Sequence, residues 1–197
     1  CTSFASRLRF AFGGLHRVAD YNLTPALNAF AKNLQKTDEN SEKGTRNILF
    51  SSYRNNLNGF NFNRNYLFNS VLRVSVVAVI NRENVSASIS LPRINTEIDV
   101  LNVQRLPYFR LVASLGAVSD MLYDASTNTY NPANEQMHGI NATYTGEWLP
   151  AENILPEQTI EVSMNENFRK VLTEDVTLVV SIAVEFGKVG FTGLPQE

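Results

Sequence analysis

The side chains that most often carry catalysis or bind metals are few in this chain and far apart. The only histidines are His16 and His138, and the only cysteine is Cys1. The sequence contains neither an H-x-x-x-H spacing for zinc nor a G-x-S-x-G turn for a serine nucleophile. It therefore predicts a protein that is not an enzyme, with no catalytic residue, no metal ligand and no cofactor.

Paired carboxylates offer a second kind of chemistry. Glu97 and Asp99, in the segment NTEID, would share one face of a predicted strand, and Glu147 precedes the only tryptophan, Trp148. A glycosidase places two carboxyl groups roughly 5 to 9.5 Å apart across the scissile bond. Residues i and i+2 of any strand meet that distance, so we favour a solvated strand face over an active site.

The segment DASTNTYNPANE has the oxygen ligands of a calcium loop at its first, third, fifth and twelfth positions. These are Asp124, Ser126, Asn128 and Glu135. Thr129 stands where such a loop needs glycine for its sharp turn, and no helical pattern flanks the segment. We therefore interpret it as an ordinary polar loop.

Charge and composition exclude several classes of protein. Seventeen basic and nineteen acidic residues give a net charge of −2, and the basic residues are scattered, so no nucleic-acid surface is indicated. No apolar run approaches the roughly 20 residues that a transmembrane segment needs. With 44% apolar residues, the chain is expected to bury one core and to form one domain.

The cysteine at position 1 allows two interpretations. A lipidated bacterial protein begins with such a residue, but the small polar tether that usually follows is replaced here by FASRLRFAF. We favour truncation of a longer chain. The compartment stays open, with an extracellular or cell-surface location as the working hypothesis.

Residues 1–44 are predicted to form a helical segment that packs on the rest of the domain. Apolar residues recur there at three- and four-residue spacing: Phe4, Leu8, Phe12, Leu15 and Val18. A second helix is expected to begin with Thr24 as its N-cap and Pro25 in its first turn. This helix ends before the polar stretch KTDENSEKG.

Residues 45–197 change to a period of two and predict an antiparallel two-sheet β-sandwich, of jelly-roll type. The alternation runs through VAVI, VSASISL, YFRLVASLGAVSD, NATYTGEW, QTIEVSMN and VTLVVSIAVEF, and NREN is expected to turn a hairpin. The last of these strands is apolar on both faces. It is therefore predicted to lie inside a sheet, with neighbouring subunits completing the fold or burying its open edges.

The asparagine-rich stretch NNLNGFNFNRNYLFN reads as a turn that feeds a strand. Asn58 and Gly59 both accept a positive φ and predict a tight turn. After it, Phe60 and Phe62 are expected on one face of a strand, with asparagines on the other.

Four short motifs resemble the landmarks of a group of small uncharacterised bacterial proteins: GTRNI, GFNFN, YFRLVASLGAVSD and IAVEF. Members of that group have a basic amphipathic helix followed by these G-x-R, G-F-[DN]-F-N, [HY]-F-[RK]-[IL]-V and G-[IV]-E-F landmarks. The resemblance implies that the chain is a fragment with Cys1 as an internal residue. It implies no activity and no functional residue.

Two functions remain after these exclusions. The favoured one is a non-enzymatic structural protein, a self-assembling β-sandwich subunit of a filament, tube, shell or surface layer, whose partners are copies of itself. Its neighbours would be joined by strand addition at a sheet edge. The alternative is a binding module, with carbohydrate as a candidate ligand, that uses aromatic and amide side chains. Its aromatic platforms would be Tyr123, Tyr130, Tyr144 and Trp148.

Overall fold

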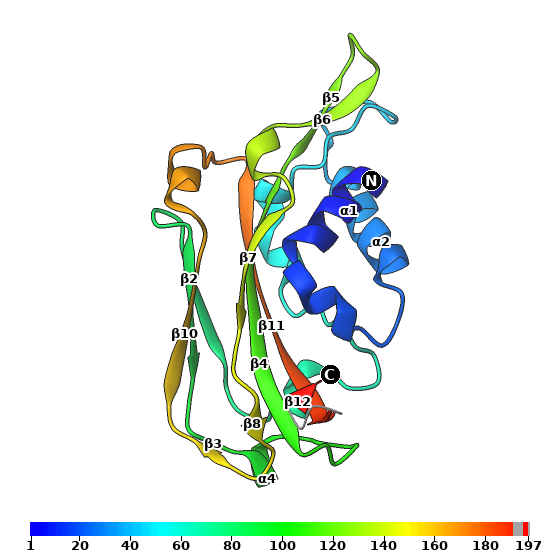
Figure 1. Cartoon of the computed structure of the whole chain (residues 1–197). Helices are drawn as coiled ribbons and strands as arrows, with labels where there is room; N and C mark the ends of the chain where they lie inside the picture. Colours follow the sequence, from blue (N-terminus) through cyan, green and yellow to red (C-terminus); the bar gives the residue numbers. More distant parts are fainter. Residues whose placement is uncertain (191–194, 197) are drawn as a thin grey trace.

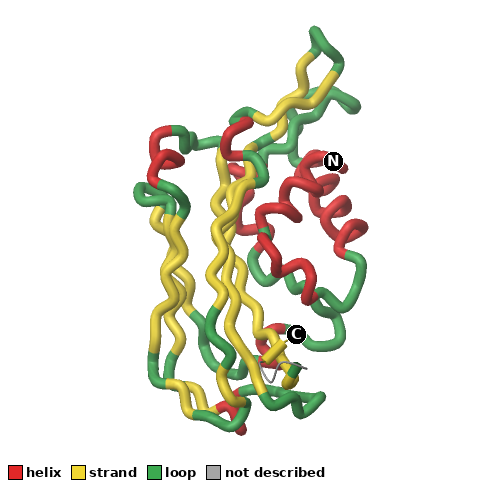
Figure 2. The backbone as a smooth tube through the Cα atoms, viewed as in Figure 1, coloured by secondary structure: helices red, strands yellow, loops and turns green. Residues whose placement is uncertain are grey.

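The computed structural model arranges the chain in three layers, two β-sheets and a layer of helices (Figure 1, Figure 2). It describes residues 1–190 and 195–196. In Figure 1 the two sheets stand at the left and centre, and the helices cover one face of the central sheet. Every strand pairing among the described residues is antiparallel. The predicted mainly-β sandwich with N-terminal helices is therefore confirmed.

The central sheet has the strand order β12-β11-β4-β7, and β8 also pairs with β4. Its strands are β4 (Tyr108–Ser119), β7 (Ile140–Thr145), β8 (Leu149–Pro150), β11 (Val176–Val189) and β12 (Pro195–Gln196). The longest pairing joins β4 to β11, from Val176 opposite Ser119 to Gly187 opposite Tyr108. These two strands form the centre of the sheet on which the other layers pack.

The outer sheet has the order β1-β2-β10. It consists of β1 (Val77–Asn81), β2 (Ser86–Leu91) and β10 (Gln158–Ser163). The predicted hairpin around NREN is present, since β1 and β2 pair antiparallel up to Asn81 and Ser86. Two short ladders stand apart from both sheets: β3 (Ile94–Asn95) with β9 (Ile154–Leu155), and β5 (Met121–Asp124) with β6 (Thr129–Pro132).

The helical elements fall into two groups. The layer on the central sheet contains α1 (Thr2–Ala11), η1 (Gly13–Val18), α2 (Leu23–Lys36) and η2 (Phe50–Leu57). Single turns occur in the connections: α3 (Phe68–Val71), α4 (Thr96–Asp99), η3 (Glu135–Met137) and η4 (Glu166–Lys170).

The first core lies between the two sheets. The alternation of side chains along a strand directs the odd-numbered residues of β4 and the even-numbered residues of β11 into it. Fully buried members include Ile89, Phe109, Leu115, Ala117 and Val176. Each large apolar side chain buried here stabilises the fold by roughly 1.5 to 3 kcal/mol.

A second core joins the helices to the other face of the central sheet. Phe4 and Leu8 of α1 and Leu27 of α2 are buried there against Val118 and Val179 of the sheet. The predicted amphipathic stripe thus packs on the chain's own sheet.

The end of α1 approaches the sheet closely because the residues beneath it are small. A Cβ atom on Gly116 would overlap the carbonyl oxygen and carbonyl carbon of Ala11. Beside it, the Ser114 hydroxyl donates to the same carbonyl at 3.3 Å. Gly116 and Ser114 therefore fix where the helix crosses β4.

The second helix begins earlier than predicted. Its N-cap is Asn22, whose side-chain oxygen accepts from the Thr24 N–H at 3.0 Å. The prediction of Thr24 as the cap was wrong, because the short amide of Asn22 already satisfies that donor. Pro25 does lie in the first turn, where its missing N–H has no helical partner.

The asparagine-rich stretch contains the predicted turn but not the predicted strand. Gly59 has φ +76°, which only glycine adopts freely. The following residues hydrogen-bond through side chains instead of a ladder: the Asn61 amide donates to the Gly59 carbonyl at 2.9 Å and accepts from the Phe68 N–H at 2.9 Å. Asparagine side chains compete well with a strand ladder for backbone groups, which explains the error.

Candidate functional site

Over most of its length, β11 has a hydrogen-bonded neighbour on one side only. In an antiparallel pair, alternate residues direct both their N–H and C=O groups to the same neighbour. The Asp120 N–H donates to the Asp175 carbonyl at 2.9 Å, in line with the register of β4 and β11. Counting in steps of two from that bond, the odd-numbered residues of β11 direct their backbone N–H and C=O groups toward β4. The even-numbered residues direct theirs toward the opposite edge of the strand.

Both ends of this opposite side are occupied. At one end, Nη1 of Arg82 donates to the carbonyl oxygen of Val176 at 2.9 Å. At the other end, β12 pairs with Lys188, which stands opposite Gln196. Between them, five residues direct their N–H and C=O groups to no hydrogen-bond partner among the described residues: Leu178, Val180, Ile182, Val184 and Phe186. We call this stretch, Leu178–Phe186, the open edge.

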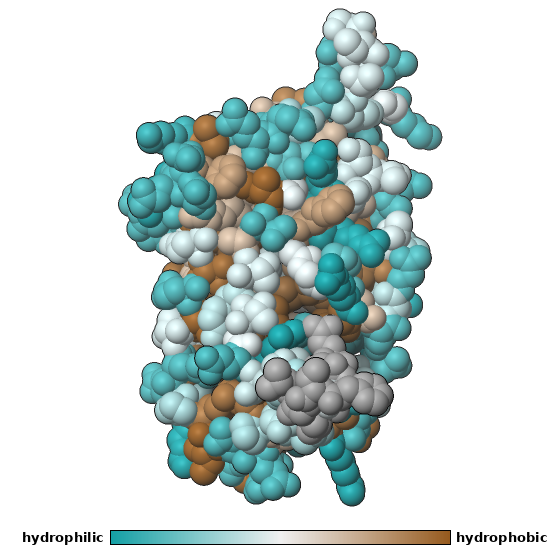
Figure 3. Space-filling view, in the orientation of Figure 1, coloured by the Kyte–Doolittle hydropathy of each residue, from teal (hydrophilic) through white to brown (hydrophobic). Residues whose placement is uncertain are grey.

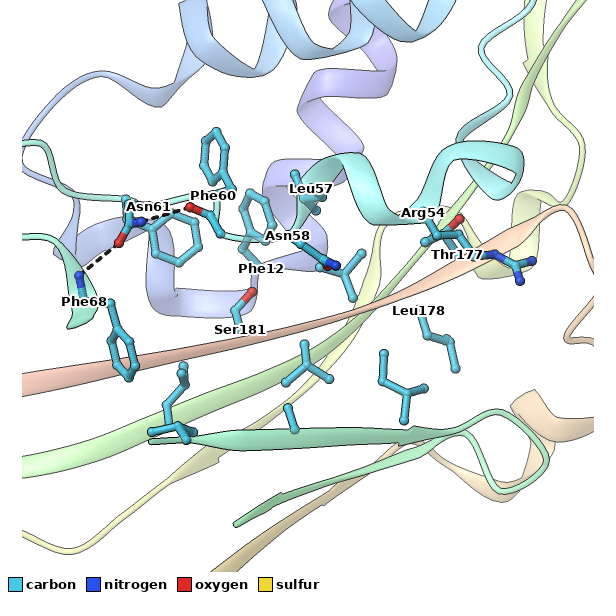
Figure 4. A pocket seen from close by; sticks show the side chains of 18 of the residues that line it. Phe12, Arg54, Leu57, Asn58, Phe60, Asn61, Phe68, Thr177, Leu178 and Ser181 are labelled. Carbon is cyan, nitrogen blue, oxygen red and sulfur yellow. Dashed lines mark hydrogen bonds between the residues drawn. The ribbon is translucent and has the colours of Figure 1, made fainter. Parts of the chain in front are cut away.

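Three adjoining cavities follow the open edge. They have volumes of about 520, 50 and 330 Å³ and meet the strand over residues 177–182, 182–184 and 184–186. Neighbouring cavities share Ile182 and Val184 among their lining residues, so they follow one another along the strand. We call this row of cavities the edge groove. Figure 4 shows its widest part, with β11 between η2 and the outer sheet.

The wall formed by the outer sheet is apolar. It includes Val76, Ala78 and Ile80, with Phe68 beside them. Ala78 and Ile80 stand opposite the core residues Ile89 and Ala87 and so share their inward face. Both are nevertheless exposed, Ile80 by 38%. Inward-facing residues of a closed sandwich are buried, so this side of the sandwich is open.

The wall formed by the helical layer is aromatic with a few polar groups. Phe12, Phe60 and Phe62 pack on one another with ring centroids 4.9 to 6.0 Å apart. The amide of Asn58 and the hydroxyl of Ser181 point toward the space between the η2 turn and β11 in Figure 4. This wall therefore offers hydrogen-bonding groups that the opposite wall lacks.

Two buried polar atoms at the Thr177 end of the groove have no hydrogen-bond partner in the described part of the chain. They are Oγ1 of Thr177, a residue only 2% exposed, and Nε of Arg54. Nη2 of Arg54 is engaged, since it donates to the Glu174 carbonyl at 2.6 Å. A buried hydroxyl without a partner destabilises a fold, so a bound group that supplied this bond would be stabilised here.

The aromatic residues predicted as platforms do not share one surface. Tyr123 and Tyr130 pack with ring centroids 5.3 Å apart on the β5–β6 hairpin, which projects from the top of the molecule in Figure 1. Tyr144 packs on the core between the sheets. Trp148 precedes β8, near the other end, where the Arg110 guanidinium lies 4.3 Å from its ring centroid.

Both residues of the carboxylate pair help to form a helical turn, Asp99 through its carboxylate and Glu97 through its backbone N–H. The prediction that NTEID forms a strand was wrong, because the segment contains the helical turn α4. There the Asn95 side chain accepts from the Glu97 N–H at 3.2 Å. One oxygen of Asp99 accepts from the Asn95 N–H at 2.8 Å. These reciprocal bonds resemble a helix cap, which explains why the segment folds as a turn.

The calcium-like loop is the tip of the β5–β6 hairpin. Asp124 accepts from the backbone and hydroxyl of Ser126 at 2.9 and 2.7 Å, and Glu135 lies beyond β6 in η3. Figure 3 colours this hairpin from hydrophilic to neutral, as expected of a solvated tip. Within the described residues, no three His, Cys, Asp or Glu side chains are grouped as metal ligands.

Two buried titratable groups lie near each other without forming a reactive pair. Burial lowers the pKa of His138 to about 4, with a smaller effect from the charge of Arg7. Nδ1 of His138 accepts from the Ser119 N–H at 3.2 Å. Burial raises the pKa of Asp120, although hydrogen bonds from Ser51 oppose this. Both side chains hold backbone and loop groups in place.

Sequence reasoning expected open edges on VTLVVSIAVEF but did not locate this one, because the segment is apolar on both faces, which is typical of a central strand. In the structure Val180, Ile182, Val184 and Phe186 are only partly buried. The predicted position inside a sheet holds, since β11 stands between β12 and β4, but β12 covers only one end of its second edge. That neighbouring subunits bury the rest of this edge stays a prediction. The partners of each strand edge cannot be read from alternation, which reports only on the two faces.

No protein-family model, no curated protein and no solved structure matches this chain. The resemblance of its short motifs to a bacterial group therefore stays an expectation. Among the described helices, none has both the length and the apolar character needed to cross a bilayer. The geometry of the open edge and its groove is thus the basis for assigning a function.

Proposed function

We propose that this protein is a non-enzymatic assembly subunit that joins neighbouring copies by adding a β-strand at the open edge. The observation that supports the proposal is a row of N–H and C=O groups, on alternate residues from Leu178 to Phe186, that have no partner among the described residues and line an apolar groove. An unpaired edge of this length is a template for another strand.

Within the part of the chain that the structure describes, the edge has few of the features that usually prevent such pairing. Native edges are blunted by charged side chains, proline or a covering loop. The open edge has one charged residue, Glu185, and its carboxylate lies 2.6 Å from the Arg110 guanidinium. Nearby, β1 is a second edge strand with no charge, and its Val77 and Val79 are more than half exposed.

A binding module is the alternative function. The Tyr123–Tyr130 pair on the projecting hairpin is the one aromatic cluster that favours it. Tyr144 and Trp148 lie elsewhere, so a carbohydrate platform built from all four aromatics finds no support in their placement. Assembly is favoured because the groove unites unpaired backbone and apolar surface in one place.

The test is the oligomeric state of two matched variants, measured by sedimentation velocity over a range of concentrations. Ala78→Lys places a charge in the groove wall, whereas Ser90→Lys places the same charge on the outer face of the same sheet. We expect the wild type and Ser90→Lys to form large particles and Ala78→Lys to remain monomeric. Circular dichroism checks that both variants fold.

Two outcomes would contradict assembly through this edge. One is a wild-type protein that stays monomeric at the highest soluble concentration. The other is an Ala78→Lys variant that assembles as the wild type does. Electron microscopy of the particles then separates an open filament or tube from a closed shell, since a non-closing contact gives helical growth.

A further inference from the structure

The geometry points to a specific occupant of the edge groove: a single uncharged strand that runs antiparallel to β11. Its apolar side chains face the outer sheet, and its polar or small side chains face the helical layer. This inference deepens the proposed function, because in the assembly a neighbouring copy supplies the strand. It names the chemistry, direction and length that any such strand must have.

The occupant is one strand because the groove has two walls. The outer sheet borders the open edge on one side, and the η2 turn with its phenylalanines borders it on the other. The edge of a second complete sandwich would bring its own packed layers against both walls. An extended segment brings only its side chains, which the cavities can hold.

The direction follows from the continuity with β12. β12 already pairs with the same side of β11, antiparallel, at Lys188 and Val189. A strand that continues the line of β12 next meets the five open-edge residues. Like Lys188, these are even-numbered, so their N–H and C=O groups point to the same side. It spans the nine positions from Leu178 to Phe186, or roughly 30 Å at about 3.4 Å per residue.

The side-chain pattern follows from the register. In an antiparallel pair, directly opposed residues lie on the same face of the sheet. Residues opposite Leu178, Val180 and Ile182 therefore point toward the outer sheet, whose wall is apolar. Residues at the alternate positions point toward Asn58, Ser181 and Thr177. A polar side chain there can supply the bond that the buried Thr177 hydroxyl lacks.

Charged side chains are disfavoured because the two charged residues that line the groove, Arg54 and Glu185, already have ionic partners. Glu185 is paired with Arg110, and Arg54 contacts Glu174 through both its carbonyl and, at 3.7 Å, its carboxylate. A charge facing the outer sheet would lose its hydration against aliphatic carbon without gaining a partner.

The direction of the occupant decides which of its N–H groups bond to β11, and a parallel strand would use the opposite set. Open-edge residues exchange both hydrogen bonds with the directly opposed residues of an antiparallel strand. The occupant's N–H groups that bond β11 therefore belong to its apolar positions. In a parallel strand they would belong to the flanking, polar positions.

The experiment measures the binding of fluorescent peptides to the full-length chain by anisotropy. The parent peptide has five valines alternating with four serines or threonines, with a lysine beyond each end for solubility. One derivative is N-methylated at the three central valines, and its matched control at three of the four polar residues. The protein is held at concentrations where unassembled molecules are present.

We expect the valine-methylated peptide to bind at least tenfold more weakly than the parent and its control to bind within about threefold of it. Ala78→Lys should weaken binding of the parent peptide, and Ser90→Lys should not. The reverse methylation pattern, equal effects of both derivatives, or no binding of the parent would each overturn the inference.

The two proposals fail in different ways. If the peptides behave as expected but the protein never associates with itself, the groove takes a strand and the assembly function is wrong. If the protein assembles, Ala78→Lys assembles equally and no peptide binds, assembly uses another surface. In that case the occupant described here is wrong, while the proposed function stands.

Discussion

Arg82, in the turn between β1 and β2, donates from Nη1 to the Val176 carbonyl at 2.9 Å and thereby ties the outer sheet to the first residue of β11. Its Nη2 also donates to the Thr173 carbonyl at 3.0 Å. The two sheets are thus joined at this end, while the edge groove separates them farther along β11. The arginine fixes where the open edge begins.

We therefore expect Arg82→Gln to lower the free energy of unfolding by about 1 to 2 kcal/mol, because two charge-assisted bonds to carbonyl groups are lost. Urea denaturation measures the change. Arg93→Gln is the matched control, since Arg93 is exposed and makes no hydrogen bond among the described residues. An equal loss in both variants would show that Arg82 does not hold the sheets together.

A pair of proline substitutions tests which side of β11 is open. Val180→Pro removes an N–H that faces the open edge, whereas Ser181→Pro removes one that bonds β4. We expect Val180→Pro to remain folded with a lower melting temperature. Ser181→Pro should lose at least about 3 kcal/mol, because proline is not tolerated inside a ladder. Thermal melts followed by circular dichroism compare them, and equal losses would contradict the assignment of the edge.

Gly116→Ala should destabilise the protein by about 1 to 3 kcal/mol. The added methyl group would overlap the backbone of Ala11, so α1 must move away from the sheet. Gly14→Ala is the control, because no atom lies within 4 Å of the place that its methyl group would take and its φ is not positive. Urea denaturation of both variants checks this, and a neutral Gly116→Ala would mean that the helix is free to shift.

Acidification should weaken the fold through His138. Its pKa is about 4 in the folded protein against an ordinary value of 6.5, so the unfolded chain binds the proton more strongly. Its contribution to stability is therefore complete above about pH 6.5 and is lost as the pH falls toward 4, by roughly 3 kcal/mol.

His138→Asn keeps an acceptor for the Ser119 N–H but cannot titrate in this range. The difference in unfolding free energy between wild type and variant should therefore change with pH across that window. Asp120, whose raised pKa acts in the opposite direction, is present in both proteins and cancels in the comparison. A difference that is independent of pH would contradict the buried, uncharged state of His138.

The layers of the fold were predictable because they follow from side-chain periodicity. The spacing of Phe4 and Leu8 indicated a helix with one buried face, and the alternation around Ile89 and Leu115 indicated strands. Both patterns arise from local geometry and burial, which the sequence encodes directly. Short-range competition was harder to anticipate, as at Asn22 and Asn61, where an amide side chain displaced the expected backbone pattern.

The candidate site was not predictable because its defining feature is a strand edge without a neighbouring strand. Val180 and Ile182 have the composition of central-strand residues, and nothing in their identity shows that one neighbour is absent. The groove unites residues from distant segments, such as Phe60, Ala78 and Ser181, none of which carries a recognisable motif. Only the pairing of the strands shows that the open edge and these distant segments lie at one place.

The long pairing of β4 with β11 also constrains how the protein folds. The two strands join over residues 108–119 and 176–187, with the strands β5 to β10 between them in the chain. Contacts so distant in sequence close a large loop and form slowly, whereas β7 lies nearer to β4 and can pair with it sooner. Any partly folded molecule in which β11 has not yet docked would present an unpaired side of β4, an edge that the native protein covers.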